Sequence, residues 1–278
     1  MTTAARVKYE VATSMVDMQS EADARELAID NVGVSSLKYP VVVLDKAHEK
    51  QSTVANISMS VALPARFKGT HMSRFVEILN EHRGELTLRT MPDLLATLRS
   101  RLLAESARVV VAFPYFLERA APASGAKGLC DYECSFIGAT RNGVDELTLC
   151  VRVPVTSVCP CSKAISDYGA HNQRGYIDIE VRTANGDENF VWIEELVQIA
   201  EASASAPVYA LLKREDERYV TMQAYDHPVF VEDMVRGVAQ SLRADSRVVW
   251  FRVHAENHES IHNHSAFAEI LWERTGDE

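Results

Sequence analysis

The chain has 278 residues, a formal net charge of −10, 47% hydrophobic residues and 24% charged residues. This length allows one large domain or two of ordinary size with a sizeable core, and the composition argues against wholesale disorder. The acidic balance argues against a general nucleic-acid-binding protein, which needs a basic surface to neutralise phosphates.

Two further features of the sequence bear on where the protein works. It has no run of about 18 apolar residues, the minimum for a membrane-spanning helix. Its first residues lack the basic start and apolar stretch of a secretory signal, so we expect a cytoplasmic protein with no membrane partner. Disulfide frameworks are rare in that compartment, and the cysteines are expected to be free thiols or ligands. There are five of them: Cys130, Cys134, Cys150, Cys159 and Cys161.

The first part of the chain contains predicted strands on both sides of two predicted helices. Residues 1–38 are polar and mixed, and we expect an N-terminal arm with one short helix near Ser20–Ala28. Ser73 is a candidate cap for the first helix, and the second begins at Pro92, a favoured first position. We expect strands at Tyr39–Leu44, Thr53–Leu63, Arg108–Leu117 and Leu129–Ala139.

The second part begins at Asn142-Gly143, a dipeptide typical of a tight hairpin turn. Residues 154–174 are expected to form a loop. Two helices are predicted at Phe190–Ala202 and Phe230–Leu242, with a charged segment between them. We expect strands at Glu146–Val153, Gly175–Thr183, Ser246–Glu256 and Ser265–Glu273.

The order of these elements suggests an internal repeat. Residues 39–143 and residues 144–278 each give strand, strand, helix, helix, strand, strand after an arm of residues 1–38. This order predicts an α+β protein with antiparallel sheets and a helical pair on one face of each. Such sheets have open edges, which a ring of subunits would cover.

Residues 154–175, PVTSVCPCSKAISDYGAHNQRG, concentrate groups that can bind a metal ion. Cys159, Cys161 and His171 lie between two predicted strands. The Cys-Pro-Cys spacing is too tight for a zinc finger, and no second pair of ligands follows. Three protein ligands with one open position would be the catalytic form of such a site. The alternative is that these thiols are simply buried small side chains.

A second segment, ENHESIHNH, is rich in histidine. If it is extended, His262 and His264 point to the same face because side chains alternate along a strand. Two such imidazoles can transfer protons near neutral pH. The alternative is a solvated loop. The letters H-N-H also suggest a nuclease, which the acidic charge argues against.

Three weaker segments complete the set of candidates. The run KREDERY offers Glu215, Asp216 and Glu217 as further metal ligands, although most charge runs form solvated faces. Glu232 lies in the first turn of a predicted helix, where it could merely complement the helix dipole. The segment RFKGTHMSR joins a strand to a helix start and could bind phosphate, although it lacks the P-loop spacing.

Together these segments resemble the type IB GTP cyclohydrolases, the prokaryotic family that opens folate synthesis. The resemblance extends from about Val32 to about Glu273, and its most specific part is the Cys-Pro-Cys segment with Ala-His-Asn-Gln-Arg-Gly downstream. It implies a tandem tunnelling fold, GTP as substrate and a homotetramer with active sites at subunit interfaces. One departure is Met222, where the family pattern leads us to expect Glu.

The resemblance also implies roles for individual residues. The ligands of one divalent metal ion (Zn, Mn or Fe) would be Cys159, His171 and Glu217. The catalytic groups would be Cys161, His262, His264 and Glu259. Glu232 would bind the guanine edge. The candidates for binding the triphosphate are Arg66, Lys68, Arg74, Lys163, Arg174 and Lys213.

The implied reaction opens the guanine imidazole ring of GTP at C8, releases formate and yields 7,8-dihydroneopterin triphosphate. Two alternatives share the scaffold: a cyclohydrolase that forms a cyclic phosphate of dihydroneopterin, and an NADPH-dependent nitrile reductase. Two others belong to different classes: a purine- or pterin-binding module without turnover, and a protein with a structural metal.

Overall fold

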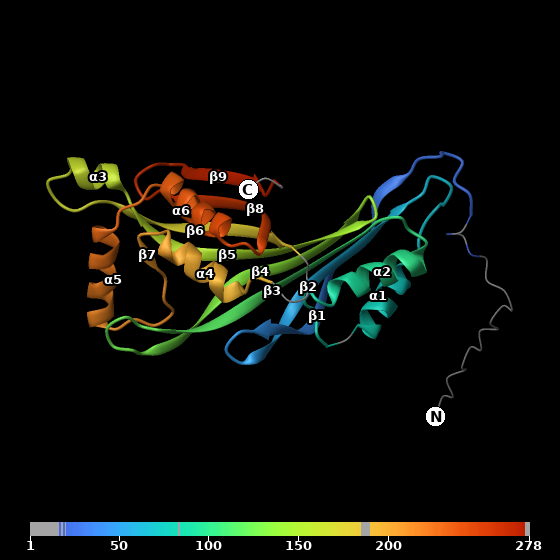
Figure 1. Ribbon diagram of the computed structural model, residues 1–278, viewed down its shortest axis with the longest axis horizontal. Helices are drawn as coiled ribbons and strands as arrows, with labels where there is room; N and C mark the ends of the chain where they lie inside the picture. Colours follow the sequence, from blue (N-terminus) through green and yellow to red (C-terminus); the bar gives the residue numbers. More distant parts are fainter. Residues whose placement is uncertain (1–16, 18, 20, 83, 185–189, 276–278) are drawn as a thin grey trace, which may run out of the picture.

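One antiparallel sheet runs through the whole molecule (Figure 1). The structure is a computed structural model that describes residues 17, 19, 21–82, 84–184 and 190–275. The strand order is β1-β2-β3-β4-β5-β6-β8-β9, and the short β7 pairs with β5. The strands are β1 (Ile29–Asp45), β2 (Glu49–Leu63), β3 (Ala107–Ala120), β4 (Lys127–Arg141), β5 (Val144–Val158), β6 (Asn172–Thr183), β7 (Ala206–Pro207), β8 (Val248–His258) and β9 (Ser265–Glu273).

Two pairs of helices pack on one face of this sheet. In the described residues the helices are α1 (Met72–Glu81), α2 (Met91–Leu102), α3 (Pro160–Ile165), α4 (Ile193–Ala202), α5 (Arg214–Asp226) and α6 (Val231–Ala244). The pair α1 and α2 packs against β1–β5, and the pair α4 and α6 packs against β5, β8 and β9, while α3 and α5 lie at the end of the sheet (Figure 1). The chain is therefore a mixed α/β protein built on one nine-stranded antiparallel sheet.

Side-chain alternation explains why only one face is covered. In β3, Val109, Val111 and Phe113 are buried under helices, because successive strand residues point to opposite faces. On the other face, β6 and β8 carry charged residues such as Asp178 and Arg252. Helix α6 buries its apolar residues at three-and-four spacing: Val231, Met234, Val235, Val238, Ala239 and Leu242. One core runs under both helical pairs.

The predicted strands are confirmed, with differences at their ends. Strand β1 begins at Ile29, ten residues before the predicted start at Tyr39, so it takes in residues 29–38 of the expected arm. The N-cap of α1 is His71 rather than Ser73. Asn142 and Gly143 have φ of 50° and 79°, as a tight hairpin turn requires.

Two predictions about irregular segments were wrong, and a third segment has a structure that was not predicted. The described residues 21–28 form bends and turns instead of a helix, while Ser20 lies outside the described residues. The expected loop at residues 154–174 contains the end of β5, the helix α3 and the start of β6. The charged segment between the late helices forms α5, in which only Asp216 and Ala224 are buried.

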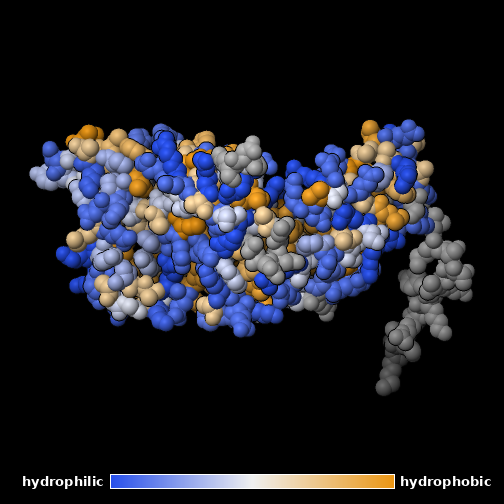
Figure 2. Space-filling view, viewed as in Figure 1, coloured by the Kyte–Doolittle hydropathy of each residue, from blue (hydrophilic) through white to orange (hydrophobic). Residues whose placement is uncertain are grey.

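No helix in the described residues is both long enough and apolar enough to cross a membrane. On the face shown in Figure 2, hydrophilic side chains dominate and apolar ones are scattered among them.

Candidate active site

The metal-binding motif predicted from the sequence folds into a short helix at the end of β5. Cys159 is the N-cap of α3, and Pro160 occupies the first position of the helix, where its missing N–H is not needed. The Cys159 Sγ accepts a hydrogen bond from the backbone N–H of Ser162 over 3.4 Å. The cap therefore orients the Cys159 thiol at the end of the sheet.

Backbone hydrogen bonds bring His171 beside Cys159. The Cys159 N–H donates to the carbonyl oxygen of His171 over 3.1 Å. The His171 N–H in turn donates to the Ser162 Oγ over 3.2 Å. Because Val158 and Asn172 are partners in the β5–β6 ladder, the sheet register itself sets the two residues side by side.

The imidazole of His171 is held by polar neighbours. Its Nδ1 lies 3.0 Å from the Gln173 Oε1 and 3.5 Å from the Ser260 Oγ. Gln173 is buried, whereas Ser260 is exposed. A metal-binding histidine commonly donates its second ring N–H to such an acceptor, which fixes the tautomer and the ring orientation.

The hairpin between β8 and β9 contributes the other histidines. The rings of His262 and His264 stack with their centroids 5.2 Å apart. The His262 Nδ1 lies 3.4 Å from the Glu259 Oε2, and the Glu259 side chain is only 12% exposed. Residues 260–264 are bent and exposed rather than extended, as the alternative of a solvated loop predicted, although the two histidine rings lie side by side and Glu259 contacts one of them.

These segments surround a cavity of about 480 Å³. Four residues predicted to be functional line it: Cys159, Glu232, Glu259 and His264. The first two residues of α6, Val231 and Glu232, also belong to the lining. The start of this helix is fixed by a hydrogen bond from the Phe230 N–H to the Asp233 Oδ2. This volume lies within the range of about 300–1,000 Å³ that is typical of small-molecule sites. Cys161, two residues from Cys159, is exposed on α3.

Glu217 does not join this group within one chain. It is exposed in the first turn of α5. Helix α5 contacts α3 near its other end, where the Lys163 Nζ lies 4.2 Å from the ring centroid of Tyr225. At 1.5 Å per residue, Glu217 is about 12 Å along the helix from that contact. Among the described residues, no three His, Cys, Asp or Glu side chains form a group that could hold a metal.

Three of the predicted triphosphate-binding residues, Arg66, Lys68 and Arg74, also lie apart from the cavity. Arg74 is in α1, at the opposite end of the molecule from α3 (Figure 1). Lys68, just before α1, forms an ion pair with Glu21 at 3.0 Å. Arg66 stacks over the Phe67 ring at 4.9 Å. In a single chain these cations and the cavity form separate surfaces.

Arg174 is close to the cavity in sequence but lies on the other face of the sheet. Its neighbour Gln173 is buried on the helical face, so alternation turns Arg174 away. It lines a separate cavity of about 280 Å³ with Arg152 and Tyr176. The Arg152 guanidinium stacks on the Tyr176 ring at 4.5 Å.

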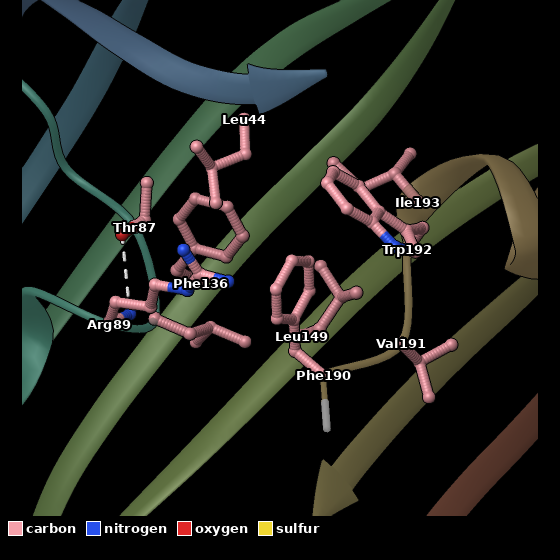
Figure 3. Close-up of a pocket in the computed structure, with 10 residues that line it drawn as sticks. Leu44, Thr87, Arg89, Phe136, Leu149, Phe190, Val191, Trp192 and Ile193 are labelled. Carbon is pink, nitrogen blue, oxygen red and sulfur yellow. Dashed lines mark hydrogen bonds between the residues drawn. The ribbon is translucent and has the colours of Figure 1, made fainter. Parts of the chain in front are cut away.

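Two other cavities lie away from the residues predicted to be functional. The pocket in Figure 3, between Leu44, Phe136 and Phe190, has a volume of about 30 Å³, which is room for about one water molecule. A larger cleft of about 920 Å³ is lined by Asp45, Glu118 and Glu194. None of the residues predicted to be functional lines this cleft.

The cysteines outside the motif have the features of packing residues. Cys134 is buried, and burial raises the pKa of its thiol well above the ordinary range. Burial likewise raises the pKa of Cys150 to about 11. Both therefore stay protonated near neutral pH and are poor ligands or nucleophiles.

Residues 15–268 match the family described as type I GTP cyclohydrolase folE2. The chain belongs to this family. It is 54% identical over 256 residues to the GTP cyclohydrolase FolE2 of Syntrophotalea carbinolica, covering 92% of this chain and 94% of that protein. It is 51% identical to the FolE2 of Syntrophus aciditrophicus, covering 92% of this chain and 99% of that one.

Solved structures show that this GTP cyclohydrolase family member shares its fold with urate oxidases. A mutant urate oxidase of Bacillus sp. TB-90 superposes with a TM-score of 0.54 at 10% identity, covering 88% of this chain and 100% of that one. The uricase of Arthrobacter globiformis gives 0.54 at 9% identity, covering 89% and 94%. At this level of identity the likeness concerns the fold alone.

Sequence reasoning missed the polar residues beneath the cavity of this folE2 family member. Gln173 and Asn257 both line it and are buried. The letters Asn-Gln-Arg-Gly contain Gln173, but its contacts depend on residues far along the chain. A buried amide inside an otherwise apolar strand face was the available signal, since buried polar groups need partners.

Proposed function

We propose that this protein is a type IB GTP cyclohydrolase I that acts in the cytoplasm. It would open the guanine imidazole ring of GTP by hydrolysis and release formate and 7,8-dihydroneopterin triphosphate, the first step of tetrahydrofolate biosynthesis. Family membership supports the reaction. The observation that supports the proposal is the cavity lined by Cys159, Glu232 and His264, the residues proposed as a metal ligand, a guanine-binding carboxylate and an acid–base group.

The donor groups fit a divalent metal ion. Cys159 and His171 would hold it through a thiolate and the His171 Nε2, because Gln173 faces the other ring nitrogen. This soft and borderline pair suits Zn²⁺, with Mn²⁺ or Fe²⁺ as further candidates. The bound ion would supply an activated water nucleophile near neutral pH.

The chain's own residues would orient the substrate and move protons. Glu232 accepts hydrogen bonds from the guanine N1–H and exocyclic amine, and it rejects adenine because adenine leaves the carboxylate unpaired. His262, His264 and Cys161 exchange protons with the ring nitrogens and the ribose oxygen, while Glu259 orients His262. General acid–base groups of this kind typically contribute about 10²–10⁴-fold to the rate.

We further propose a homotetramer with active sites at subunit interfaces and two tunnelling-fold halves, residues 39–143 and 144–278, in each chain. The separation of Glu217 and Arg74 from Cys159 within one chain supports the shared site. A neighbouring subunit would bring the third metal ligand, Glu217, and the triphosphate-binding cations Arg66, Lys68 and Arg74. The exposed Phe267 and Ile165 near the cavity support burial by another subunit.

The test is to incubate the zinc-loaded or manganese-loaded protein with GTP and to measure formate together with the mass of the pterin product. The proposal expects one formate for each dihydroneopterin triphosphate. A cyclic phosphate product would instead assign the related cyclohydrolase reaction. GTP binding without formate would assign a non-catalytic binding module.

A further inference from the structure

A buried hydroxyl group lies at the centre of a polar cluster beneath the cavity. Ser157, at the end of β5, is fully buried. Its Oγ has three partners: it lies 3.0 Å from the Val229 carbonyl oxygen, 3.3 Å from the Gln173 Nε2 and 3.2 Å from the Asn257 Nδ2. These contacts connect β5, β6, β8 and the segment that leads into α6.

The chemistry of these groups fixes the direction of every hydrogen bond. A backbone carbonyl oxygen only accepts, so the single Ser157 proton goes to Val229. The two lone pairs of Ser157 then accept, one from Gln173 and one from Asn257. Gln173 must therefore present its amide nitrogen to Ser157 and its oxygen to His171, which lies 3.0 Å away.

Reversing the Gln173 amide would break this pattern. Its oxygen would then need the Ser157 proton that Val229 uses, and its NH₂ group would face His171 instead. A buried carbonyl oxygen that lacks a hydrogen-bond donor is destabilising. The pattern seen leaves Gln173, Ser157 and Val229 each paired.

Asn257 holds the cluster from the other side. It pairs with Gly175 in the β6–β8 ladder. A Cβ atom at Gly175 would lie 2.4 Å from the Asn257 Oδ1, so the glycine leaves the space that this amide fills. The Asn257 side chain is therefore confined, with its nitrogen directed at Ser157 and its buried Oδ1 without a hydrogen-bond partner among the described residues.

We propose that the Val229 carbonyl, acting through Ser157 and Gln173, locks His171 in the tautomer that carries its proton on Nδ1. The Gln173 oxygen requires a donor at Nδ1, and Ser260 at 3.5 Å can accept from the same proton. The lone pair of His171 is then always on Nε2. Gln173 and Ser157 are positioning residues, and their importance for the reaction rests on the proposed function.

The cluster also connects the two sides of the site. Val229 precedes Glu232 by three residues, and both line the cavity. The segment that presents the guanine-binding carboxylate is thus hydrogen-bonded, through two side chains, to the imidazole of the metal ligand. A metal ion can therefore bind the His171 Nε2 without a proton first moving from Nε2 to Nδ1.

The test is ¹⁵N NMR of the full-length, metal-free protein labelled at its nine histidines. His171 is assigned by the signal that disappears in the His171→Asn variant. At about pH 8.5, where an ordinary imidazole is neutral, we expect a protonated Nδ1 and a bare Nε2. A wild-type signal with the proton on Nε2 would overturn the proposal without any further variant.

Variants then test the chain of hydrogen bonds. Gln173→Met removes the acceptor, and we expect mixed tautomers with about a tenfold to hundredfold loss of zinc affinity in chelator competition. Ser157→Ala should give a smaller change of the same kind. Gln51→Met is the matched control, since among the described residues the Gln51 side chain bonds to Asp45 and Phe116, and it should leave both readouts unchanged.

The outcomes separate this inference from the proposed function. If Gln173→Met keeps the wild-type tautomer and zinc affinity while wild-type protein releases formate from GTP, the tautomer lock is wrong and the function stands. If the tautomer is fixed and responds to Gln173→Met but GTP yields no formate, the lock stands and the proposed function is wrong.

Discussion

The amide of Cys159 donates a hydrogen bond to the carbonyl oxygen of His171 over 3.1 Å, although the two lie twelve positions apart in sequence (171 − 159). The bond continues the β5–β6 ladder by one step beyond Val158 and Asn172. The intervening residues form α3 and a turn that passes through Gly169, which has a φ of 64°. The backbones of Cys159 and His171 are therefore brought together by the sheet register.

A first prediction separates the ligand role of Cys159 from its capping role. Serine is a good N-cap, so Cys159→Ser should preserve α3 while replacing a soft sulfur ligand by a hard, weakly acidic oxygen. We expect bound zinc to be lost and kcat/KM to fall by more than about 10²-fold, because an activated metal-bound water contributes several kcal/mol. Metal analysis and GTP turnover measure the two effects.

The control for this variant is Cys150→Ser, in the strand that ends just before Cys159. Cys150 lies in β5 but outside the cavity lining, and its raised pKa keeps it a neutral thiol. Metal content and turnover should stay at wild-type levels. Retention of both by Cys159→Ser would contradict the assigned ligand.

A second prediction concerns guanine recognition by Glu232. Glu232→Gln keeps the size of the side chain but turns one acceptor oxygen into a donor that faces the donors of guanine. Hydrogen bonds to charged groups contribute about 1.5–3 kcal/mol, so kcat/KM for GTP should fall by about 10- to 150-fold. Steady-state kinetics with GTP measures this.

Asp233→Asn, in the same turn of α6, is the matched control. The Asp233 carboxylate accepts from the Phe230 N–H and is absent from the cavity lining. Asparagine also accepts at such a position, so we expect wild-type kinetics. Equal losses in the two variants would mean that Glu232 acts only through the start of the helix.

Much of the fold could be predicted because local patterns agree with the long-range pairing. The strand at Thr53–Leu63 alternates cleanly, and its burial follows that alternation. The first part of β1 was missed because register shifts at Ile29/Val32 and Val34/Leu37 break the period, and Ser36 has a φ of 61°. Helix α5 was missed because it buries only two residues and so lacks an apolar stripe.

The candidate site likewise contains some residues that are close together in sequence and others that are far apart. Cys159 and His171 are visible in one short segment of sequence. The partners of Gln173, by contrast, are Ser157 and Asn257, which are 16 and 84 residues away (173 − 157 and 257 − 173). Only the pairing of β5, β6 and β8 brings these three side chains together, and no spacing rule in the sequence reports it.

A third prediction concerns the pH dependence of the start of α5. Asp216 is fully buried and accepts hydrogen bonds from Ser124, Ala123 and Lys213. Burial alone would raise its pKa, but these hydrogen bonds outweigh burial and hold the pKa of Asp216 well below the ordinary value. The unfolded chain has an ordinary Asp pKa of about 3.9.

Because the folded pKa is the lower one, this stabilisation is complete above about pH 4 and is lost as the pH falls towards the folded pKa. Urea unfolding from pH 7 to pH 3 should therefore show a stability difference between wild type and Asp216→Asn that shrinks at low pH. The exposed neighbour Glu215→Gln is the control and should show no such trend. If the difference in stability between wild type and Asp216→Asn did not change with pH, the hydrogen bonds would not favour the charged form of Asp216.

The last prediction tests whether the active site is shared between subunits. Cys159 and Glu217 lie on different surfaces of one chain, so each site would combine Cys159 of one subunit with Glu217 of its neighbour. Cys159→Ala and Glu217→Gln should each be inactive alone. When the two variants are mixed and reassembled at equal amounts, random pairing should restore roughly a quarter of the sites.

Activity of the mixture is the measurement, with light scattering to confirm the assembly. The control mixes Cys159→Ala with His171→Ala. The hydrogen bond from the Cys159 N–H to the His171 carbonyl oxygen keeps both proposed ligands in the same chain. No pairing of subunits can therefore rebuild a site, and the mixture should stay inactive. Failure of the first mixture to recover, although mixed assemblies form, would mean that one chain supplies Cys159 and Glu217 together, and that α5 must move towards α3 to complete the site.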